Sequence, residues 1–242
     1  MSTGPRSTAR HTGSRVWHGV LAGVIAASLI TQLVLLFTGG ADVNSGHAEV
    51  QVALGVRLIR LFSYFTIQSN LFVLFVAVTL AVNPARDGRG WRVARLDALL
   101  GITITGVVFA LVLAPLVHPV GVAWWVNLGF HRLSPVLAVL GWLLFGPRPR
   151  VDRATITKAL LIWPVLWILY TFAHGALTDW YPYPFLDVTD IGFGTALRNA
   201  LFVLVAAGIL AWIMQIVDKN LGGARPTTVT GQAPPRTDRQ EA

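Results

Sequence analysis

The chain has 242 residues, of which 54% are hydrophobic and only 12% are charged. Soluble domains carry about a quarter charged residues, and here the charges are confined to short segments between long apolar runs, which excludes a large soluble domain. The formal net charge is +8, and because the chain has no cysteine it forms no disulfide, no iron–sulfur cluster and no thiol nucleophile.

Apolar runs of about 18–25 residues have the length needed to cross the roughly 30 Å hydrocarbon core of a bilayer. Because lipid offers no hydrogen-bond partners, the backbone of such a run must form a helix. The sequence contains six of these runs, at about residues 17–37, 57–82, 96–117, 124–145, 156–177 and 195–217. We therefore predict an all-α polytopic membrane protein whose six-helix transmembrane domain covers residues 17–217.

Polar segments precede and follow these helices. We predict that residues 1–16 and 218–242 are disordered tails, because their composition does not supply an apolar core. The tails share one side of a six-helix bundle with segments 83–95 and 146–158, and these four segments carry most of the basic residues. The basic residues elsewhere are Arg57, Arg60, Arg132 and Arg198. The positive-inside rule therefore predicts that both termini are cytoplasmic, and this topology explains the positive charge without a nucleic-acid partner.

Polar side chains recur at helical spacing on three of the predicted helices. They are Ser63, Thr66 and Asn70 on the second helix, Asn127, His131 and Ser134 on the fourth, and Tyr170, His174 and Thr178 on the fifth. Residues three and four apart share one face of a helix. Interhelical hydrogen bonds explain any single one of these residues, but three stripes together favour a polar cavity. We expect no acidic side chain inside the helices, which argues against ion-coupled transport.

Thr66 and His131 have the clearest chemistry among these residues. At a rise of 1.5 Å per residue, both lie roughly 10–12 Å below the outer membrane surface. A neutral histidine can act as a general base near pH 7, and a threonine hydroxyl becomes a nucleophile once a base takes its proton. The candidate donors to a developing oxyanion are Asn70, Asn127 and Ser134.

Arg57 and Arg60 interrupt the one-sided charge pattern, one turn apart at the outer mouth of the second predicted helix. Arginine binds carboxylate and phosphate groups bidentately. The pair is therefore a candidate clamp for an anionic head group or a fatty-acid carboxylate. The alternative is ion pairing with outer acidic residues, which are Asp42, Glu49, Asp179, Asp187 and Asp190.

Three short segments resemble motifs of the androgen-induced-protein family of multi-pass membrane hydrolases, and in particular its bacterial branch. The segments are Phe65-Thr66-Ile67, Asn127-Leu128-Gly129-Phe130-His131 and Tyr183-Pro184-Phe185-Leu186, with His174 and Trp180 before the last. With the helix order, the resemblance covers about residues 55–215. It implies a multi-pass helical protein of the bacterial plasma membrane with an intramembrane threonine and histidine.

By this resemblance, Thr66 is the nucleophile and His131 is its base. Animal members of the family hydrolyse fatty acid esters of hydroxy fatty acids, so the resemblance implies a membrane lipid or fatty-acid ester as substrate, entering laterally from the bilayer. It implies neither a cofactor nor a metal ion. The expected substrate-binding residues are Arg57, Arg60, Asn70, Asn127, Ser134 and His174.

Two other interpretations stay open from the sequence. The polar cavity and outer arginines also suit a non-enzymatic transporter or a lipid-binding protein, because missing carboxylates argue only against ion coupling. Haem ligation would need two facing histidines, drawn from His118, His131 and His174, and a Soret absorption band would reveal it.

Overall fold

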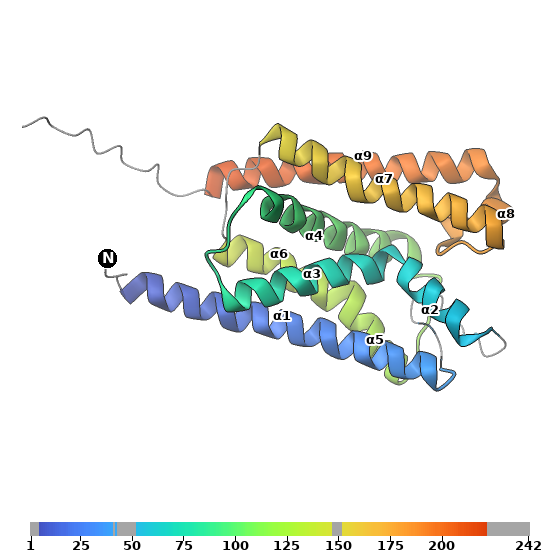
Figure 1. The fold of residues 1–242 in the computed structure, drawn as a ribbon, viewed down its shortest axis with the longest axis horizontal. Coiled ribbons are helices and arrows are strands. Elements are labelled where there is room, and N and C mark those ends of the chain that lie inside the picture. The colour runs from blue at the N-terminus through green and yellow to red at the C-terminus, as the bar shows by residue number, and fades with distance from the viewer. Residues whose placement is uncertain (1–4, 41, 43–51, 147–151, 222–242) are drawn as a thin grey trace, which may run out of the picture.

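The computed structural model describes residues 5–40, 42, 52–146 and 152–221, and these residues form helices joined by short connections (Figure 1). Six helices are long and apolar enough to cross a membrane. The spans are Ala9–Phe37, Phe65–Val82, Arg89–Leu113, Val122–Phe145, Arg153–Thr178 and Phe193–Val217. The predicted all-α bundle of six transmembrane helices is therefore confirmed.

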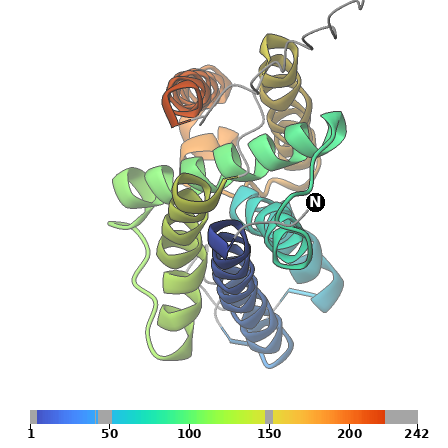
Figure 2. The ribbon, with the colours of Figure 1, turned by 90° about the vertical axis from the view of Figure 1, so that its left-hand side faces the viewer.

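The elements follow the chain in a simple order, with two π-helical turns (η1 and η2) and one 3-10 turn (η3) between α-helices. They are α1 (Pro5–Phe37), α2 (Leu54–Ser63), α3 (Phe65–Val82), α4 (Arg89–Val108), η1 (Phe109–Leu113), α5 (Val122–Leu128), η2 (Gly129–Leu133), α6 (Ser134–Phe145), α7 (Arg153–Thr178), η3 (Pro184–Leu186), α8 (Val188–Ile191) and α9 (Phe193–Leu221). Helix α4 lies between the α7–α9 pair on one side and α1, α3 and α6 on the other (Figures 1 and 2).

Helix α1 begins and α9 ends at the same end of the bundle (Figure 1). We call it the basic end, after Arg10, Arg86, Arg92, Arg153 and Lys158. The opposite end carries α2, η3 and α8 (Figure 1). Large apolar side chains such as Ile30, Phe202 and Trp212 are more than half exposed on the outer faces. Such a surface is a liability in water but matches the apolar solvent provided by lipid tails, so this is a multi-pass membrane protein.

Helix α1 begins at Pro5 rather than near residue 17, so the prediction of disorder is wrong for residues 5–16. This added helix packs on the end of α6, where the Arg10 guanidinium donates a hydrogen bond of 3.3 Å to the Phe145 carbonyl. At the other terminus α9 continues to Leu221, beyond the predicted end at residue 217. Residues 1–4 and 222–242 of the predicted tails lie outside the described residues.

The predicted second helix, residues 57–82, is two helices that meet at Tyr64. Tyr64 has extended backbone angles (φ −66°, ψ 130°) and separates α2 from α3. Side chains satisfy the carbonyl groups released by the break: the Trp167 indole N–H donates to Ser63 O at 2.9 Å, and the Gln68 amide donates to Phe62 O at 2.9 Å. The break makes Thr66 the second residue of a helix rather than a mid-helix residue.

Two other predicted helices also differ from the structure. The third begins at Arg89 rather than near residue 96, which places Asp97 in the interior of α4 instead of at a helix end. Asp97 is buried there, so the expectation of acid-free helix interiors is wrong. The third and fourth helices each contain a π-helical turn, η1 and η2. Such turns occur frequently at functional sites, and these two meet where the Phe109 ring of η1 stacks on His131 of η2, at the candidate site described next.

Candidate active site

Thr66 and His131 meet in the interior of the bundle. Thr66 Oγ1 lies 3.4 Å from His131 Nε2, and both residues are 3% exposed. Thr66 is supplied by the first turn of α3, and His131 is the central residue of η2. A nucleophile–base contact is often longer than 3.2 Å before substrate binds and tightens in the reacting complex. The geometry therefore suits transfer of the Thr66 proton to His131.

The other ring nitrogen of His131 identifies its tautomer. Nδ1 lies 3.3 Å from the Asn127 carbonyl oxygen, which can only accept a hydrogen bond. We therefore assign the proton to Nδ1, which leaves the lone pair of Nε2 directed at Thr66. The Phe109 ring stacks on the imidazole with a centroid distance of 4.1 Å and an interplanar angle of 21°, and so limits its rotation.

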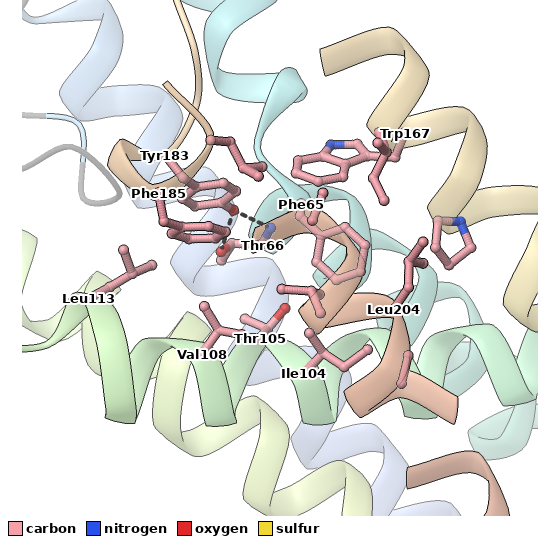
Figure 3. Close-up of a pocket in the computed structure, with 16 residues that line it drawn as sticks. Phe65, Thr66, Ile104, Thr105, Val108, Leu113, Trp167, Tyr183, Phe185 and Leu204 are labelled. Atoms are coloured by element: carbon pink, nitrogen blue, oxygen red, sulfur yellow. Dashed lines mark hydrogen bonds between the residues drawn. The ribbon is translucent and has the colours of Figure 1, made fainter. Parts of the chain in front are cut away.

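Tyr183, which precedes η3, completes the site and was not predicted to take part in it. The Thr66 backbone N–H donates to Tyr183 Oη at 3.1 Å, and Oη lies 3.1 Å from Thr66 Oγ1 (Figure 3). Burial raises the pKa of Tyr183 to about 12, although its hydrogen bonds to Thr66 oppose the rise. The phenol is therefore protonated near neutral pH and can donate a hydrogen bond at Thr66. In the sequence, Tyr183 belonged to one of the three family-like segments, and no role in the site was assigned to it.

Asn70 and Ser134 support the site rather than face the pocket described below. The Asn70 amide donates to the Thr66 carbonyl at 2.8 Å and to the Phe130 carbonyl at 3.3 Å. The Ser134 hydroxyl lies 2.6 Å from Asn70 Oδ1 and 3.1 Å from Phe130 O. These bonds tie α3 to η2 and fix the separation of nucleophile and base. We therefore replace Asn70 and Ser134 by Tyr183 as the candidate oxyanion donor.

The position of Thr66 in α3 adds an electrostatic contribution. The first N–H groups of a helix have no partner within the helix, and they carry the positive end of its dipole. Thr66 is the second residue of the 18-residue helix α3, so negative charge developing on Oγ1 lies beside this positive end. The helix terminus therefore stabilises the alkoxide form of Thr66 relative to a mid-helix threonine.

An apolar pocket borders Thr66 on the side where α7 and α9 lie (Figure 3). Its empty volume, counting space open to the surroundings, is about 610 Å³. The three polar lining residues are Thr66, Thr105 and Tyr183. The remaining lining residues are Phe65, Ile104, Val108, Leu113, Pro164, Trp167, Ile168, Phe185, Leu186, Ala200, Val203, Leu204 and Ala207. Thr66 therefore lines the pocket, whereas its partner His131 does not.

Three predicted binding residues lie elsewhere. His174 is half-buried and stacks on Tyr170 at the outer part of α7, so it does not join the buried cluster. Arg57 donates to the Leu36 carbonyl at 2.7 Å, and the Arg60 guanidinium lies 5.2 Å from the Trp180 ring centroid. Neither arginine lines the pocket beside Thr66. Asn127 is buried beside His131, but it is the Asn127 backbone carbonyl, and not the side chain, that accepts the hydrogen bond from His131 Nδ1.

Comparison of the chain with models of protein families, with curated proteins and with solved structures finds no match. Among the described residues, no group of three or more histidine or acidic side chains is arranged to hold a metal ion.

Proposed function

We propose that this protein is a membrane-embedded hydrolase of fatty-acid esters, with Thr66 as nucleophile and His131 as general base. One observation carries the proposal: Thr66 lines an apolar pocket, and its Oγ1 lies 3.4 Å from the Nε2 atom of the buried His131. Apolar clefts with a few convergent polar groups are typical small-molecule sites. An acyl chain fits such a lining, and its carbonyl carbon would be brought to the Thr66 hydroxyl.

The reaction proceeds in two stages. His131 Nε2 takes the Thr66 proton as Oγ1 attacks the acyl carbonyl carbon, and the resulting oxyanion accepts a hydrogen bond from the Tyr183 hydroxyl. The imidazolium returns that proton to the departing alkoxide, which leaves as an alcohol. Water, deprotonated by His131, then attacks the acyl-threonine ester. The proton returns to Thr66 Oγ1 as the carbon–oxygen bond breaks, and the free fatty acid is released.

The two stages need only groups that the site supplies. A general base contributes about 10²–10⁴-fold in rate, and an oxyanion donor contributes about 10²–10³-fold. The Nδ1 hydrogen bond to Asn127 O holds His131 in the tautomer that accepts the proton. The roles of Thr66 and His131 agree with those implied by the resemblance to the androgen-induced-protein family.

The proposed location is the plasma membrane of a bacterium, with the basic end in the cytoplasm as the positive-inside rule predicts. Thr66 then lies toward the outer end of its span, Phe65–Val82. A lipid substrate would reach the pocket from the bilayer without leaving an apolar environment.

Ester turnover by purified protein in detergent tests the proposal. Wild type is expected to hydrolyse a fatty-acid ester, and Thr66→Ala and His131→Ala are expected to lose this activity. His18→Ala serves as the control, because His18 is equally buried but lies near the basic end. Ester turnover that persists in Thr66→Ala would rule out Thr66 as the nucleophile. A folded wild type that binds fatty acid without hydrolysing esters would instead support a lipid-binding protein.

A further inference from the structure

The pocket beside Thr66 is elongated along the bundle axis. Helices α4 and α7 run away from the basic end, and α9 runs toward it (Figure 1). The lining residues nearest the basic end are therefore Ile104 on α4, Pro164 on α7 and Ala207 on α9. Tyr183 lies beside Thr66, while Ile104 and Leu204 lie farther along the pocket (Figure 3). The pocket thus extends from the reacting hydroxyl toward the basic end.

Hydrogen bonding between α3 and α4 fixes the level of Thr66 in this pocket. The hydroxyls of Ser69 and Thr105 lie 2.8 Å apart, so these two residues are level. Thr66 is three residues before Ser69 and thus about 4–5 Å farther from the basic end. Ile104 is one residue beyond Thr105, so about 6 Å of pocket separates Thr66 from the level of Ile104.

Helix α9 gives an upper bound on the same length. Ala200 and Ala207 both line the pocket and are each 2% exposed. Seven residues of helix span about 10 Å. The lining of α9 thus covers about 10 Å of the bundle axis, and we take this whole length as the upper limit for the part of the pocket beyond Thr66. A zigzag alkyl chain with bonds of about 1.5 Å advances about 1.3 Å per carbon, so the pocket holds roughly five to eight carbons.

We propose that the pocket selects esters of straight short- to medium-chain acids, and that Ala207 and Ile104 set the limit of chain length. The proposal rests on the proposed hydrolase function. The methyl group of Ala207 leaves room at the deep end, which a larger side chain would fill. The Ile104 side chain occupies the same level from α4, so a smaller residue there would lengthen the pocket.

Hydrolysis of p-nitrophenyl esters from acetate to palmitate by the full-length protein tests the limit. Wild type is expected to show its highest kcat/KM between hexanoate and octanoate, with palmitate lower by about tenfold or more. Ala207→Leu is expected to move the optimum two or three carbons shorter, and Ile104→Ala to move it by a similar amount longer. The gain with longer esters in Ile104→Ala does not arise from misfolding.

Ala206→Leu is the matched control, because Ala206 is the neighbouring residue on the exposed face of α9. It is expected to keep the wild-type profile. A profile in either pocket variant that matches wild type would overturn the assignment of Ala207 and Ile104. A wild-type profile that stays flat to palmitate would overturn the length limit while leaving the hydrolase intact.

A binding measurement separates this proposal from the hydrolase itself. Calorimetric titration of Thr66→Ala with straight-chain N-methyl alkanamides, which resist hydrolysis, is expected to give the tightest Kd at six to eight carbons. The optimum should shift shorter in Thr66→Ala/Ala207→Leu. A shifted optimum without esterase activity in wild type would support the length limit and refute the hydrolase. Equal affinity for all lengths would refute the length limit.

Discussion

The two most deeply buried histidines of the described chain differ in what their second ring nitrogen faces. His131 and His18 are 3% and 4% exposed, and each places Nδ1 near the carbonyl four residues earlier, at 3.3 Å from Asn127 O and 2.7 Å from Ser14 O. His131 then reaches the Thr66 hydroxyl on another helix at the wall of a pocket. The second polar contact of His18 is made by the same atom, Nδ1, which lies 3.2 Å from the Ser14 hydroxyl of its own helix.

Burial of a histidine does not by itself indicate a functional role. A buried histidine is satisfied by its own helix in both places, and the same local bond holds each ring. Of the two, only His131 uses its remaining nitrogen to contact a hydroxyl, and that hydroxyl belongs to Thr66, a residue that lines a pocket. His18 lies beside an apolar cavity too, but the polar residue that shares that cavity is Arg95, which is no nucleophile. The following changes test whether the cross-helix hydroxyl is what distinguishes the two sites.

The largest effect is expected from removing the Thr66 hydroxyl. Thr66→Ala should lower kcat/KM for a fatty-acid ester by at least about 1,000-fold, because no other group replaces the nucleophile. Thr66→Ser keeps the hydroxyl and should retain measurable turnover. Thr171→Ala is the matched control in another buried threonine, which does not line the pocket. Equal losses in Thr66→Ala and Thr171→Ala would indicate a packing effect.

The next effect distinguishes the two histidines directly. His131→Gln should lower kcat by about 100- to 1,000-fold, because an amide cannot accept the Thr66 proton. His18→Gln should stay within about fivefold of wild type, since it leaves the base untouched. Both variants are measured in the same assay after size-exclusion chromatography. Equal losses in both would remove the distinction between the sites.

Tyr183→Phe should have a smaller effect of about 100-fold on kcat, because it removes one hydrogen-bond donor to the oxyanion and keeps the ring. Tyr181→Phe is the control two residues away. Since the pKa of Tyr183 is raised to about 12, its donor form persists below that value and is lost only as pH rises through it. The pH–rate profile should therefore show no loss attributable to Tyr183 below about pH 10. A fall in wild type near pH 9 that Tyr183→Phe abolishes would contradict this role.

Asn70→Ala tests the scaffold that joins α3 to η2. Its removal takes one hydrogen bond each from the Thr66 carbonyl, the Phe130 carbonyl and the Ser134 hydroxyl, and each lost bond costs about 0.5–1.5 kcal/mol. The apparent Tm in detergent should fall clearly. Folded protein, normalised for concentration, should lose less activity than Tyr183→Phe. An unchanged Tm would show that these hydrogen bonds do not support the site.

The smallest effect on stability is expected from the exposed Arg92–Asp87 ion pair. Arg92 holds the pKa of Asp87 down to about 2, chiefly through a hydrogen bond. Because the folded pKa lies below the usual value of 3.8, this stabilisation is present above pH 4 and is lost as pH falls through about 2. Exposed pairs contribute little, so Arg92→Gln should leave the apparent Tm at pH 7 unchanged within about 1 °C. A drop as large as that of Asn70→Ala would contradict this ranking.

Hydrophobicity sufficed to predict the six spans, because lipid requires long apolar helices. Helical spacing also indicated Thr66 and His131 as residues that share a cavity. Helical spacing could not predict the break at Tyr64. The carbonyl groups that the break releases accept hydrogen bonds from Trp167 and Gln68, and Trp167 is distant in sequence. The role of Tyr183 was missed for a similar reason: a segment between helices places its hydroxyl, and no helical period describes that segment.

The arginine predictions depended on charge pattern and guanidinium chemistry, and the His174 prediction on helical spacing, and neither gives a position around the bundle. Residues at similar depth can face different neighbours around a bundle, and Arg57, Arg60 and His174 do so. Lateral position is set by helix packing, which sequence periodicity does not reveal. The sequence also did not predict the π-helical turn η2, which carries His131, because the pattern of its residues is typical of an ordinary α-helix.

The most direct test of the central claim is to locate a covalent adduct. Purified wild type, His131→Gln, His18→Gln and Thr66→Ala would be treated with an alkyl fluorophosphonate, and the modified residue identified by peptide mass spectrometry. We expect one adduct, on Thr66 Oγ1, formed with loss of fluoride in wild type and His18→Gln, and strongly slowed in His131→Gln. Modification of folded Thr66→Ala at the wild-type rate, or no adduct on Thr66 in active wild type, would contradict the account.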